Sequence, residues 1–406
     1  MNLKTSLDSI LKKGFFILFS KISSSIFLFL SSVIILNYGS TSILGSYTFF
    51  QTSAVIMVSF IDLGITNSSV HFLKKQKINK YIFYNNSFTL VFIITVLFST
   101  IFYFISKNFE TYENIHFILI CSFLLWIINY FSVKIQTDDN YFLFFLVKIS
   151  PNFIQFVGVI LLVFFDNLFL INIIKVYFIS IILPAIILIL KNFDFTKKIK
   201  LSLLLKIMLF SFRAYKMTLI SSIAKKGDIL IMKYLGGDYI IGLYTIPKQC
   251  LTFFDEFTKS MTWPLFNKIN IDNIALRYKI LNDFIKKQLY LLIILFIISN
   301  LLIWSVFDLF IQNDDNFIIK INSSLILIAS LLAPFIVSTN SFSVYVGKLD
   351  LLFNAVFIAT VIQFMIITLF YDKIGIYIFP ISFIINQFVI SLISVLILNK
   401  YHRNEE

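Results

Sequence analysis

Long apolar runs separated by short polar segments divide the chain from near its start to near its end. About 20 consecutive apolar residues are needed for an α-helix to cross the roughly 30 Å hydrocarbon core of a bilayer. Helices satisfy their own backbone hydrogen bonds in lipid, so these runs predict membrane-spanning helices. Twelve spans are predicted, at residues 14–36, 43–65, 82–106, 115–133, 141–165, 170–190, 207–232, 239–263, 288–311, 317–340, 351–371 and 374–398.

An internal repeat divides these spans into two groups of six. Residues 39–48 have the sequence GSTSILGSYT and residues 236–245 have the sequence GGDYIIGLYT, with Gly, Gly, Tyr and Thr in common at an offset of 197. We expect both segments in the short outside turn after the first helix of each half, with glycine in the turn and tyrosine at the membrane interface.

The repeat predicts an all-α integral membrane protein with two pseudo-symmetric six-helix lobes around a central cavity. Because six is even, both halves have the same orientation, and their pseudo-twofold axis lies along the membrane normal. The expected domains are an N-terminal lobe at 1–190, a cytoplasmic linker at 191–206 and a C-terminal lobe at 207–406.

Composition and charge support this topology. The chain of 406 residues is 59% hydrophobic with a mean hydropathy of +0.90, too apolar for a soluble protein of this length. Its net charge of +13 is explained by loop placement: with the N-terminus cytoplasmic, inside segments contain 21 Lys or Arg and outside loops only four. This asymmetry follows the positive-inside rule, places both termini in the cytoplasm and argues against nucleic-acid binding.

The remaining basic residues lie within predicted spans, where a charge near the bilayer centre costs about 2.5–3.5 kcal/mol. The repeat maps Lys225 and Lys226 onto Leu28 and Phe29, deep in the first span. Asp228 is three residues after Lys225 and can pair with it. A local salt bridge with snorkelling is the alternative role, and snorkelling alone also accounts for Arg213 and Lys216, which are nearer the cytoplasmic end.

A polar stripe marks the next span, and a single lysine marks the first. Lys248, Thr252, Asp255, Lys259 and Thr262 share one helical face, with Glu256 beside it. The stripe is expected to line a cavity or a polar partner, although an i, i+4 pair of Asp255 and Lys259 would make part of it structural. Lys21 has serines on its face and no acid on its own span, which favours an anion ligand; Lys148 and Lys175 are weaker candidates.

The cations outnumber the acids, so the central cavity is expected to be cationic and to receive an anionic guest, for which phosphate is the natural candidate. Motifs for ATP hydrolysis, zinc hydrolysis and Ser-His-Asp catalysis do not occur, and the two cysteines show no metal spacing. We expect no catalytic residue, no metal site and no cofactor beyond a coupling ion, for which proton and sodium both remain open.

Twelve spans in two repeats, with a Gly-x-Tyr turn after the first and seventh helices, resemble the bacterial polysaccharide-biosynthesis flippases. These O-antigen and repeat-unit translocases belong to the multidrug/oligosaccharidyl-lipid/polysaccharide (MOP) superfamily. The best local likeness is KKGDILIMKYLGGDYIIGLYTIPKQ at residues 225–249. The resemblance implies a transporter of the bacterial inner membrane that carries an undecaprenyl-diphosphate-linked oligosaccharide, an O-antigen or capsule repeat unit, outward by alternating access.

The resemblance also implies roles for individual residues and for partners. The expected substrate ligands of the cationic lumen are Lys21, Arg213, Lys216, Lys225, Lys226, Lys248 and Lys259. The acids Asp228, Asp255 and Glu256 are expected to couple or gate transport. The chain is expected to be a monomer that contacts membrane lipids and works beside polysaccharide polymerase and chain-length proteins. The first half departs from the second, since Gln51, Val55 and Val58 correspond to Lys248, Thr252 and Asp255.

Two alternatives remain open. A multidrug exporter of the same superfamily would favour cationic drugs and acidic residues in the N-terminal cavity, and the span 14–36 has no acid. A repeat-unit polymerase, which is a membrane glycosyltransferase, would need a substantial outside loop carrying Arg. Every predicted outside loop is short and contains no Arg.

Overall fold

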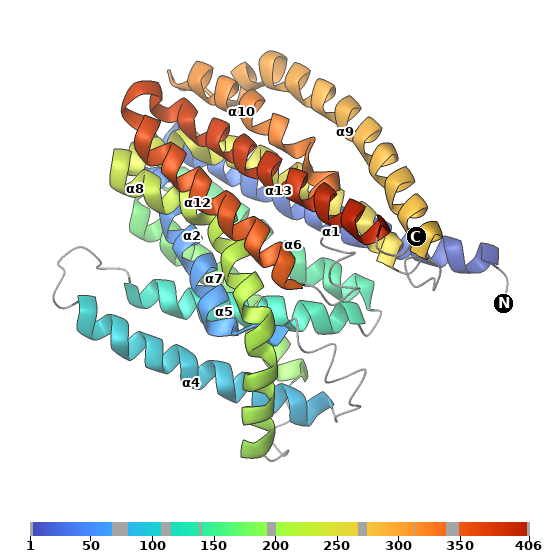
Figure 1. Ribbon diagram of the computed structural model, residues 1–406. Helices are drawn as coiled ribbons and strands as arrows, with labels where there is room; N and C mark the ends of the chain where they lie inside the picture. The colour runs from blue at the N-terminus through green and yellow to red at the C-terminus, as the bar shows by residue number, and fades with distance from the viewer. Residues whose placement is uncertain are drawn as a thin grey trace.

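The computed structural model describes residues 3–66, 80–106, 115–137, 140–192, 200–266, 274–312, 314–337 and 349–403. All regular structure within these ranges is helical (Figure 1). The first half contains α1 (Leu3–Tyr38), α2 (Thr41–Asp62), α4 (Lys80–Ser106), α5 (Ile115–Thr137), α6 (Tyr141–Phe164) and α7 (Leu170–Asn192). The second half contains α8 (Leu201–Phe266), α9 (Ile274–Phe310), α10 (Asn316–Ser330), α12 (Leu349–Ile374), the short 3₁₀ helix η2 (Gly375–Tyr377) and α13 (Ile378–Arg403).

Each of the twelve predicted spans is helical over most of its described residues. Eight segments of the described chain are long and apolar enough to cross a membrane. Two of them, of 46 and 45 residues, each contain two predicted spans, because Gly237 divides α8 and η2 separates α12 from α13. The shorter apolar helices His116–Ser132 and Asn316–Ser330 account for the last two. The helices are thus those of a multi-pass membrane protein.

Some helix ends differ from the prediction. The predicted span 317–340 is interrupted, because α10 ends at Ser330 and helical backbone returns only at 333–337. Pro334 explains the break: its ring would clash with the carbonyl of residue 330, and it has no N–H to donate there. The polar segments 201–206 and 274–287 are helical extensions of α8 and α9. Hydropathy marks the limits of the bilayer, and a helix can continue beyond them.

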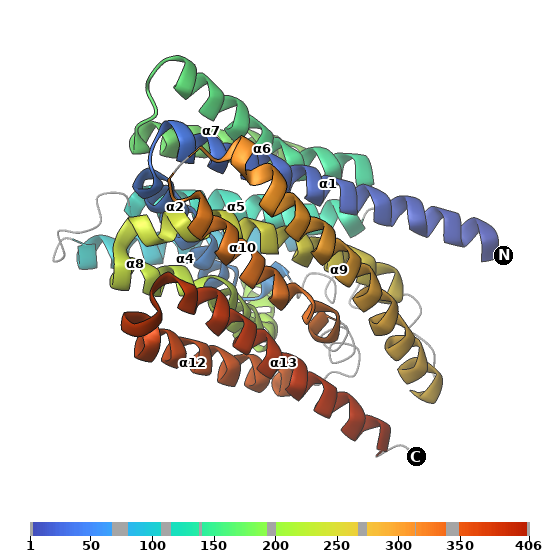
Figure 2. The same ribbon diagram turned by 90° about the horizontal axis from the view of Figure 1, so that it is seen from above.

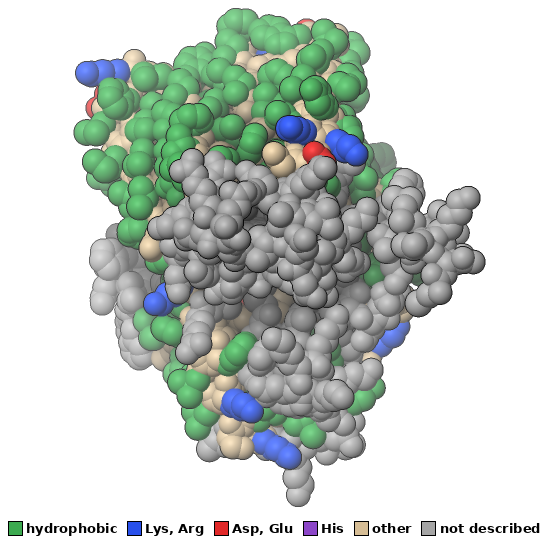
Figure 3. All heavy atoms as spheres, turned by 45° about the vertical axis from the view of Figure 1, so that its right-hand side comes forward, with side chains coloured by type: hydrophobic (Ala, Val, Ile, Leu, Met, Phe, Trp, Pro, Cys, Tyr) green, Lys and Arg blue, Asp and Glu red, His purple; other side chains and the backbone are tan. Residues whose placement is uncertain are grey.

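The outer surface is apolar, as a lipid-facing surface must be. Large hydrophobic side chains are widely exposed, among them Leu190 (71%), Leu209 (70%) and Leu301 (66%). In the upper part of Figure 3 the described side chains are mostly hydrophobic, and the few charged ones include two Lys or Arg side chains beside an acid near the middle of the view. A soluble monomer does not expose so much contiguous apolar surface.

The two halves meet mainly where α1 and α2 pack against α8. Within the first half α1 packs on α6, and α5 packs on α2 and α7. Within the second half α10 and α12 pack on α8 and α13. Figure 2 shows α6 and α7 on one side of the molecule and α12 and α13 on the other, with α8 between them. Helix α8 is therefore the main element of the second half that presents side chains to the first.

Reciprocal contacts at this boundary follow the repeat. A methyl group at Gly45 would lie 1.7 Å from the carbonyl oxygen of Asp238, and one at Gly242 would lie 2.0 Å from that of Thr41. The offset of 197 relates Gly45 to Gly242 and Thr41 to Asp238. The hydroxyl oxygens of Thr48 and Thr245, also 197 residues apart, are 2.9 Å from each other. These contacts agree with a pseudo-twofold axis between α2 and the second part of α8.

The expected placement of the repeat in an outside turn is only partly correct. The helix breaks lie at its first residues: Gly39 precedes the N-cap Ser40 of α2, and Gly237 has a φ of 68° that suits glycine. The Tyr residues expected at the membrane interface are instead inside helices, with Tyr47 0% and Tyr244 1% exposed. The small glycines permit close helix contact, and the neighbouring tyrosines pack inside their own halves, Tyr47 on Tyr177 of α7 and Tyr244 on Phe379 of α13.

Candidate functional site

Glu256 joins two lysines from opposite halves of the protein. One carboxylate oxygen lies 2.6 Å from Nζ of Lys21 on α1, and the other lies 2.7 Å from Nζ of Lys259 on α8. Asp255 is 3.8 Å from the same Lys259 ammonium. All of these side chains are partly accessible, with exposed fractions of 22–34%. A single carboxylate therefore bridges the boundary between α1 and α8.

Two further lysines lie within electrostatic range of these groups. Lys148 on α6 interacts with the charges of Lys21 and Glu256, and its ammonium donates a hydrogen bond of 3.1 Å to Asn129 Oδ1. Lys225, in the first part of α8, interacts with the charges of Lys259, Asp255 and Glu256. We call this set the lysine–carboxylate cluster; its members are Lys21, Lys148, Lys225, Asp255, Glu256 and Lys259.

The geometry corrects two expectations for this cluster. Lys21 has no acid within its predicted span 14–36, but Glu256 reaches it from α8, so Lys21 is not an unpaired cation. The expected pair of Asp255 and Lys259 is present, yet Glu256 lies closer to Lys259 than Asp255 does. Four lysines and two carboxylates leave an excess of positive charge.

Asp228 and Lys248 form a second, deeper ion pair within α8. Asp228 is fully buried, and its Oδ2 lies 2.5 Å from Nζ of Lys248. Its other oxygen accepts a hydrogen bond of 3.0 Å from the backbone N–H of Ile229. The Lys248 ammonium also lies 4.4 Å from the ring centre of Phe383 and 5.5 Å from that of Tyr244. Both rings can stabilise the cation through their π faces.

Lys225, the partner that helical spacing offers to Asp228, is not its partner in the structure. The chain reverses at Gly237, so the two parts of α8 lie side by side and Lys248 faces Asp228. Lys225 is exposed and interacts with the charges of the lysine–carboxylate cluster instead. Spacing along one helix allows an i, i+3 pair, but a helix hairpin offers partners that this spacing does not show.

The remaining predicted ligands lie in different surroundings. Lys226 interacts with the charges of Lys248 and Asp228, so it belongs beside the deeper pair. Lys216 is exposed toward the start of α8. Arg213 is part of α8, but its side chain lies outside the described residues. The structure thus divides the predicted lumen into two charged groups and leaves Lys216 apart.

Sequence reasoning underrated or missed three contributors. Lys148 ranked below the other lysines because its partner residues are on other helices. Gln249 Nε2 donates a hydrogen bond of 2.6 Å to Ser32 Oγ across the boundary of the two halves. Phe383 contributes from α13. The predicted spans of this chain contain several other amides and many aromatic residues, so nothing in the sequence distinguishes these two residues.

The cluster is suited to holding an anion with two separated oxygen atoms. Glu256 already places one oxygen on each of two lysines, and a phosphate or diphosphate group presents oxygens in the same way. Within the described residues no group of three or more His, Cys, Asp and Glu side chains is arranged to hold a metal ion. The arrangement favours binding of an anion by ammonium groups from both halves.

Comparisons with known proteins identify the fold. No family model and no curated protein matches the chain. Its fold is similar to that of a solved structure described as protein A (TM-score 0.73, 11% identity, 97% of this chain and 95% of that one). It is also similar to the eukaryotic MATE transporter AtDTX14 (TM-score 0.66, 13% identity, 96% and 95%).

A third solved structure is a MOP superfamily transporter from Pyrococcus furiosus. It aligns with a TM-score of 0.60 at 12% identity over 97% of this chain and 95% of that one. That protein is described by the reverse polarity of its binding pocket, which suggests a different function for it. The chain therefore has the fold of MATE transporters of the MOP superfamily.

Proposed function

We propose that this protein is a flippase that moves an undecaprenyl-diphosphate-linked oligosaccharide, an O-antigen or capsule repeat unit, from the inner to the outer leaflet of the bacterial cytoplasmic membrane. It acts as a transporter and not as an enzyme, with both termini in the cytoplasm. The two halves alternate in their access to the two sides, driven by a proton or a sodium ion. The diphosphate binds between the halves while the lipid chain stays in the bilayer.

The observation that carries this proposal is the way Glu256 is held. Its two oxygens contact Lys21 of the first half and Lys259 of the second at 2.6 Å and 2.7 Å. A diphosphate carries more charge than a carboxylate and is able to displace it from both lysines. Lys148 and Lys225 are near enough to add to the attraction. In this partly desolvated interior the field of several lysines is stronger than it would be in water.

A multidrug exporter is the second candidate, and the shared fold with MATE transporters favours it. The charge of the site distinguishes the two. An exporter of cationic drugs needs acids to attract its substrate, whereas here lysines outnumber acids and each described carboxylate of the cluster is occupied by a lysine. The MOP transporter from Pyrococcus furiosus, with its pocket of reverse polarity, is a precedent for such a difference within this fold.

Deletion of the gene tests the proposal in cells. Lipid-linked repeat units are then expected to accumulate on the cytoplasmic leaflet, and a plasmid copy is expected to restore export. The double substitution of Lys21 and Lys259 by Ala should fail to restore it at normal protein levels. Lys175→Ala is the matched control, because Lys175 is exposed on α7. Normal export combined with increased drug sensitivity would identify the multidrug exporter instead.

A further inference from the structure

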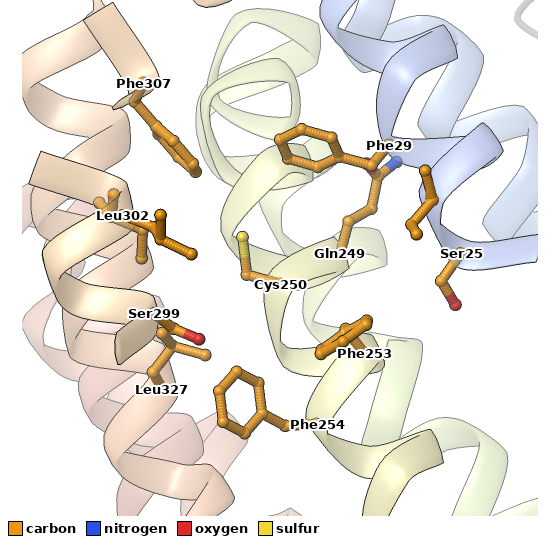
Figure 4. A pocket seen from close by; sticks show the side chains of 12 residues that line it. Ser25, Phe29, Gln249, Cys250, Phe253, Phe254, Ser299, Leu302, Phe307 and Leu327 are labelled. Atoms are coloured by element: carbon orange, nitrogen blue, oxygen red, sulfur yellow. The ribbon is translucent and has the colours of Figure 1, made fainter. Parts of the chain in front are cut away.

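An apolar groove lies beside the lysine–carboxylate cluster, at the boundary of the two halves. It has a volume of about 190 Å³ and is lined by side chains of α1, α8, α9 and α10. Figure 4 shows these side chains converging from three directions: Phe29 and Ser25 from α1, Phe253 and Cys250 from α8, and Leu302 from α9. We call this space the lateral groove.

The groove extends from the lipid-facing surface into the protein. Its outer walls include Ile26 of α1 and Leu302 of α9, which are 46% and 51% exposed. Its deep wall is formed by Phe254, Ile303 and Leu327, which are at most 3% exposed. An apolar chain can therefore enter from the bilayer without passing through water.

The groove and the cluster are adjacent on two helices. On α1, Ser25 of the groove follows Lys21 of the cluster by one helical turn, about 5–6 Å. On α8, Phe253 of the groove precedes Glu256 of the cluster by three residues, again one turn. An anionic head group on the lysines would thus place the start of its own lipid chain at the groove.

We propose that the lateral groove binds the first isoprene units of the substrate's polyprenyl chain while the diphosphate occupies the lysine–carboxylate cluster. This inference rests on the proposed function and adds a second binding site to it. The polyprenyl diphosphate is chosen over a membrane phospholipid because several lysines match the higher charge of a diphosphate. The chain and its head group belong to one molecule, and the two sites are one helical turn apart.

The main effect of the groove is to position the lipid chain, and it adds little to the binding free energy of the substrate. A lipid tail is as apolar in the bilayer as in the groove, so its transfer gains packing contacts but little hydrophobic free energy. Aromatic walls such as Phe253 and Phe254 supply these contacts. Holding the chain at one place fixes the diphosphate relative to Lys21 and Lys259, which favours the productive geometry over the many orientations of a free lipid.

Cys250 supplies a native probe, since it lines the groove and is partly accessible, whereas the other cysteine, Cys121, is buried. In the full-length Cys121→Ala protein in proteoliposomes, the rate of Cys250 alkylation by N-ethylmaleimide is measured. Undecaprenyl diphosphate is expected to slow alkylation several-fold. Inorganic pyrophosphate and phosphatidylglycerol are expected to leave the rate unchanged, because the first has no chain and the second lacks the diphosphate.

Each other outcome overturns a specific statement. Equal protection by phosphatidylglycerol would show that ordinary lipid occupies the groove. If inorganic pyrophosphate, which has no lipid chain, also protects Cys250, the thiol is shielded by a change of conformation and not by a chain in the groove. If undecaprenyl diphosphate binds without protecting Cys250, the lateral groove is not the binding site of the polyprenyl chain, and the proposed function still stands. If undecaprenyl diphosphate shows no binding in a thermal-shift assay, the proposed function itself is wrong.

A groove-filling variant tests the same inference without the thiol. Leu302→Trp narrows the outer part of the groove, and it is expected to reduce the preference of the transporter for long over short polyprenyl diphosphates several-fold. Leu301→Trp is the matched control, because Leu301 is the neighbouring α9 residue, is 66% exposed and does not line the groove. Equal effects of both substitutions on chain-length preference, at equal thermal stability, would contradict the assignment.

Discussion

Lys21 and Glu256 form a salt bridge of 2.6 Å that connects the first helix of one half to the last part of α8 in the other. The same carboxylate also holds Lys259. An anion that binds these lysines must displace Glu256, and this displacement breaks the ionic connection between α1 and α8. Substrate binding and separation of the halves near the cluster are thereby linked through one side chain.

Removal of this carboxylate is expected to strengthen anion binding. In Glu256→Gln, Lys21 and Lys259 lose their shared acid, so pyrophosphate should bind about tenfold more tightly, which corresponds to about 1.4 kcal/mol. The folded protein should lose less than about 1 kcal/mol, because both side chains are partly exposed. Isothermal titration calorimetry on the purified protein gives the affinity.

Asp238→Asn is the control for this experiment. Asp238 forms a salt bridge of the same length, 2.6 Å, with Lys233 at the far end of α8's first part, away from the cluster. Its substitution should leave pyrophosphate binding unchanged. Weaker binding by Glu256→Gln would mean that the carboxylate supports the anion site by positioning the lysines.

Variants of the ion pair of Asp228 and Lys248 are expected to distinguish its contribution to stability from its contribution to transport. Asp228→Asn leaves the Lys248 ammonium, whose side chain is only 15% exposed, without its acid, and removal of one partner of a buried pair typically costs about 3–5 kcal/mol. The double variant Asp228→Leu with Lys248→Met replaces the pair by apolar side chains of similar volume and should regain most of that stability. Thermal unfolding in detergent measures both.

Transport by the double variant then decides the role of the pair. If Asp228 is a coupling acid, a stable double variant should still bind undecaprenyl diphosphate but fail to move it. Full transport by a stable double variant would show that the pair has only a structural role. The measurement is flipping of a fluorescent polyprenyl diphosphate in proteoliposomes.

Replacing a glycine of the repeat by alanine is expected to destabilise the protein, although Gly→Ala within a helix usually stabilises it. Gly→Ala within a helix normally stabilises by about 1 kcal/mol. In Gly242→Ala the new methyl would meet the Thr41 carbonyl oxygen at 2.0 Å, so α2 and α8 must move apart at a cost of about 1–3 kcal/mol or more. Ser42→Ala, at an exposed position of α2, should change the free energy of unfolding by only a few tenths of a kcal/mol. A higher melting temperature for Gly242→Ala would contradict the close contact.

A disulfide between α2 and α8 should stop the transport cycle. Thr48 and Thr245 have hydroxyl oxygens 2.9 Å apart, so cysteines placed there in a chain without Cys121 and Cys250 are expected to cross-link on oxidation. The cross-linked protein should bind substrate but not flip it, and a reducing agent should restore flipping. The single variant Thr48→Cys controls for the oxidant. Unchanged flipping by the cross-linked protein would show that these helices stay together throughout the cycle.

The sequence predicts well what is local and less well what depends on the tertiary fold. The spans and the repeat follow from hydropathy and identity, and the close pairing of Thr48 with Thr245 matches the offset of 197. The partner of Asp228 could not be predicted, because helical spacing offers Lys225 while the hairpin at Gly237 brings Lys248. The contact of Lys21 with Glu256 joins residues of different halves, and no pattern within either span indicates it.

The reciprocal contact of Gly45 and Gly242 has the form of an isologous interface, in which each partner presents the same surface to the other. Two copies of one six-helix chain would form such an interface around a true twofold axis. Here both copies belong to one polypeptide, so each half is free to differ away from the axis. Val58 in the first half corresponds to Asp255 in the second, a difference that identical subunits could not have. Because the halves are fused in one chain, the contact between α2 and α8 can be symmetric while the charged residues nearby differ between the halves.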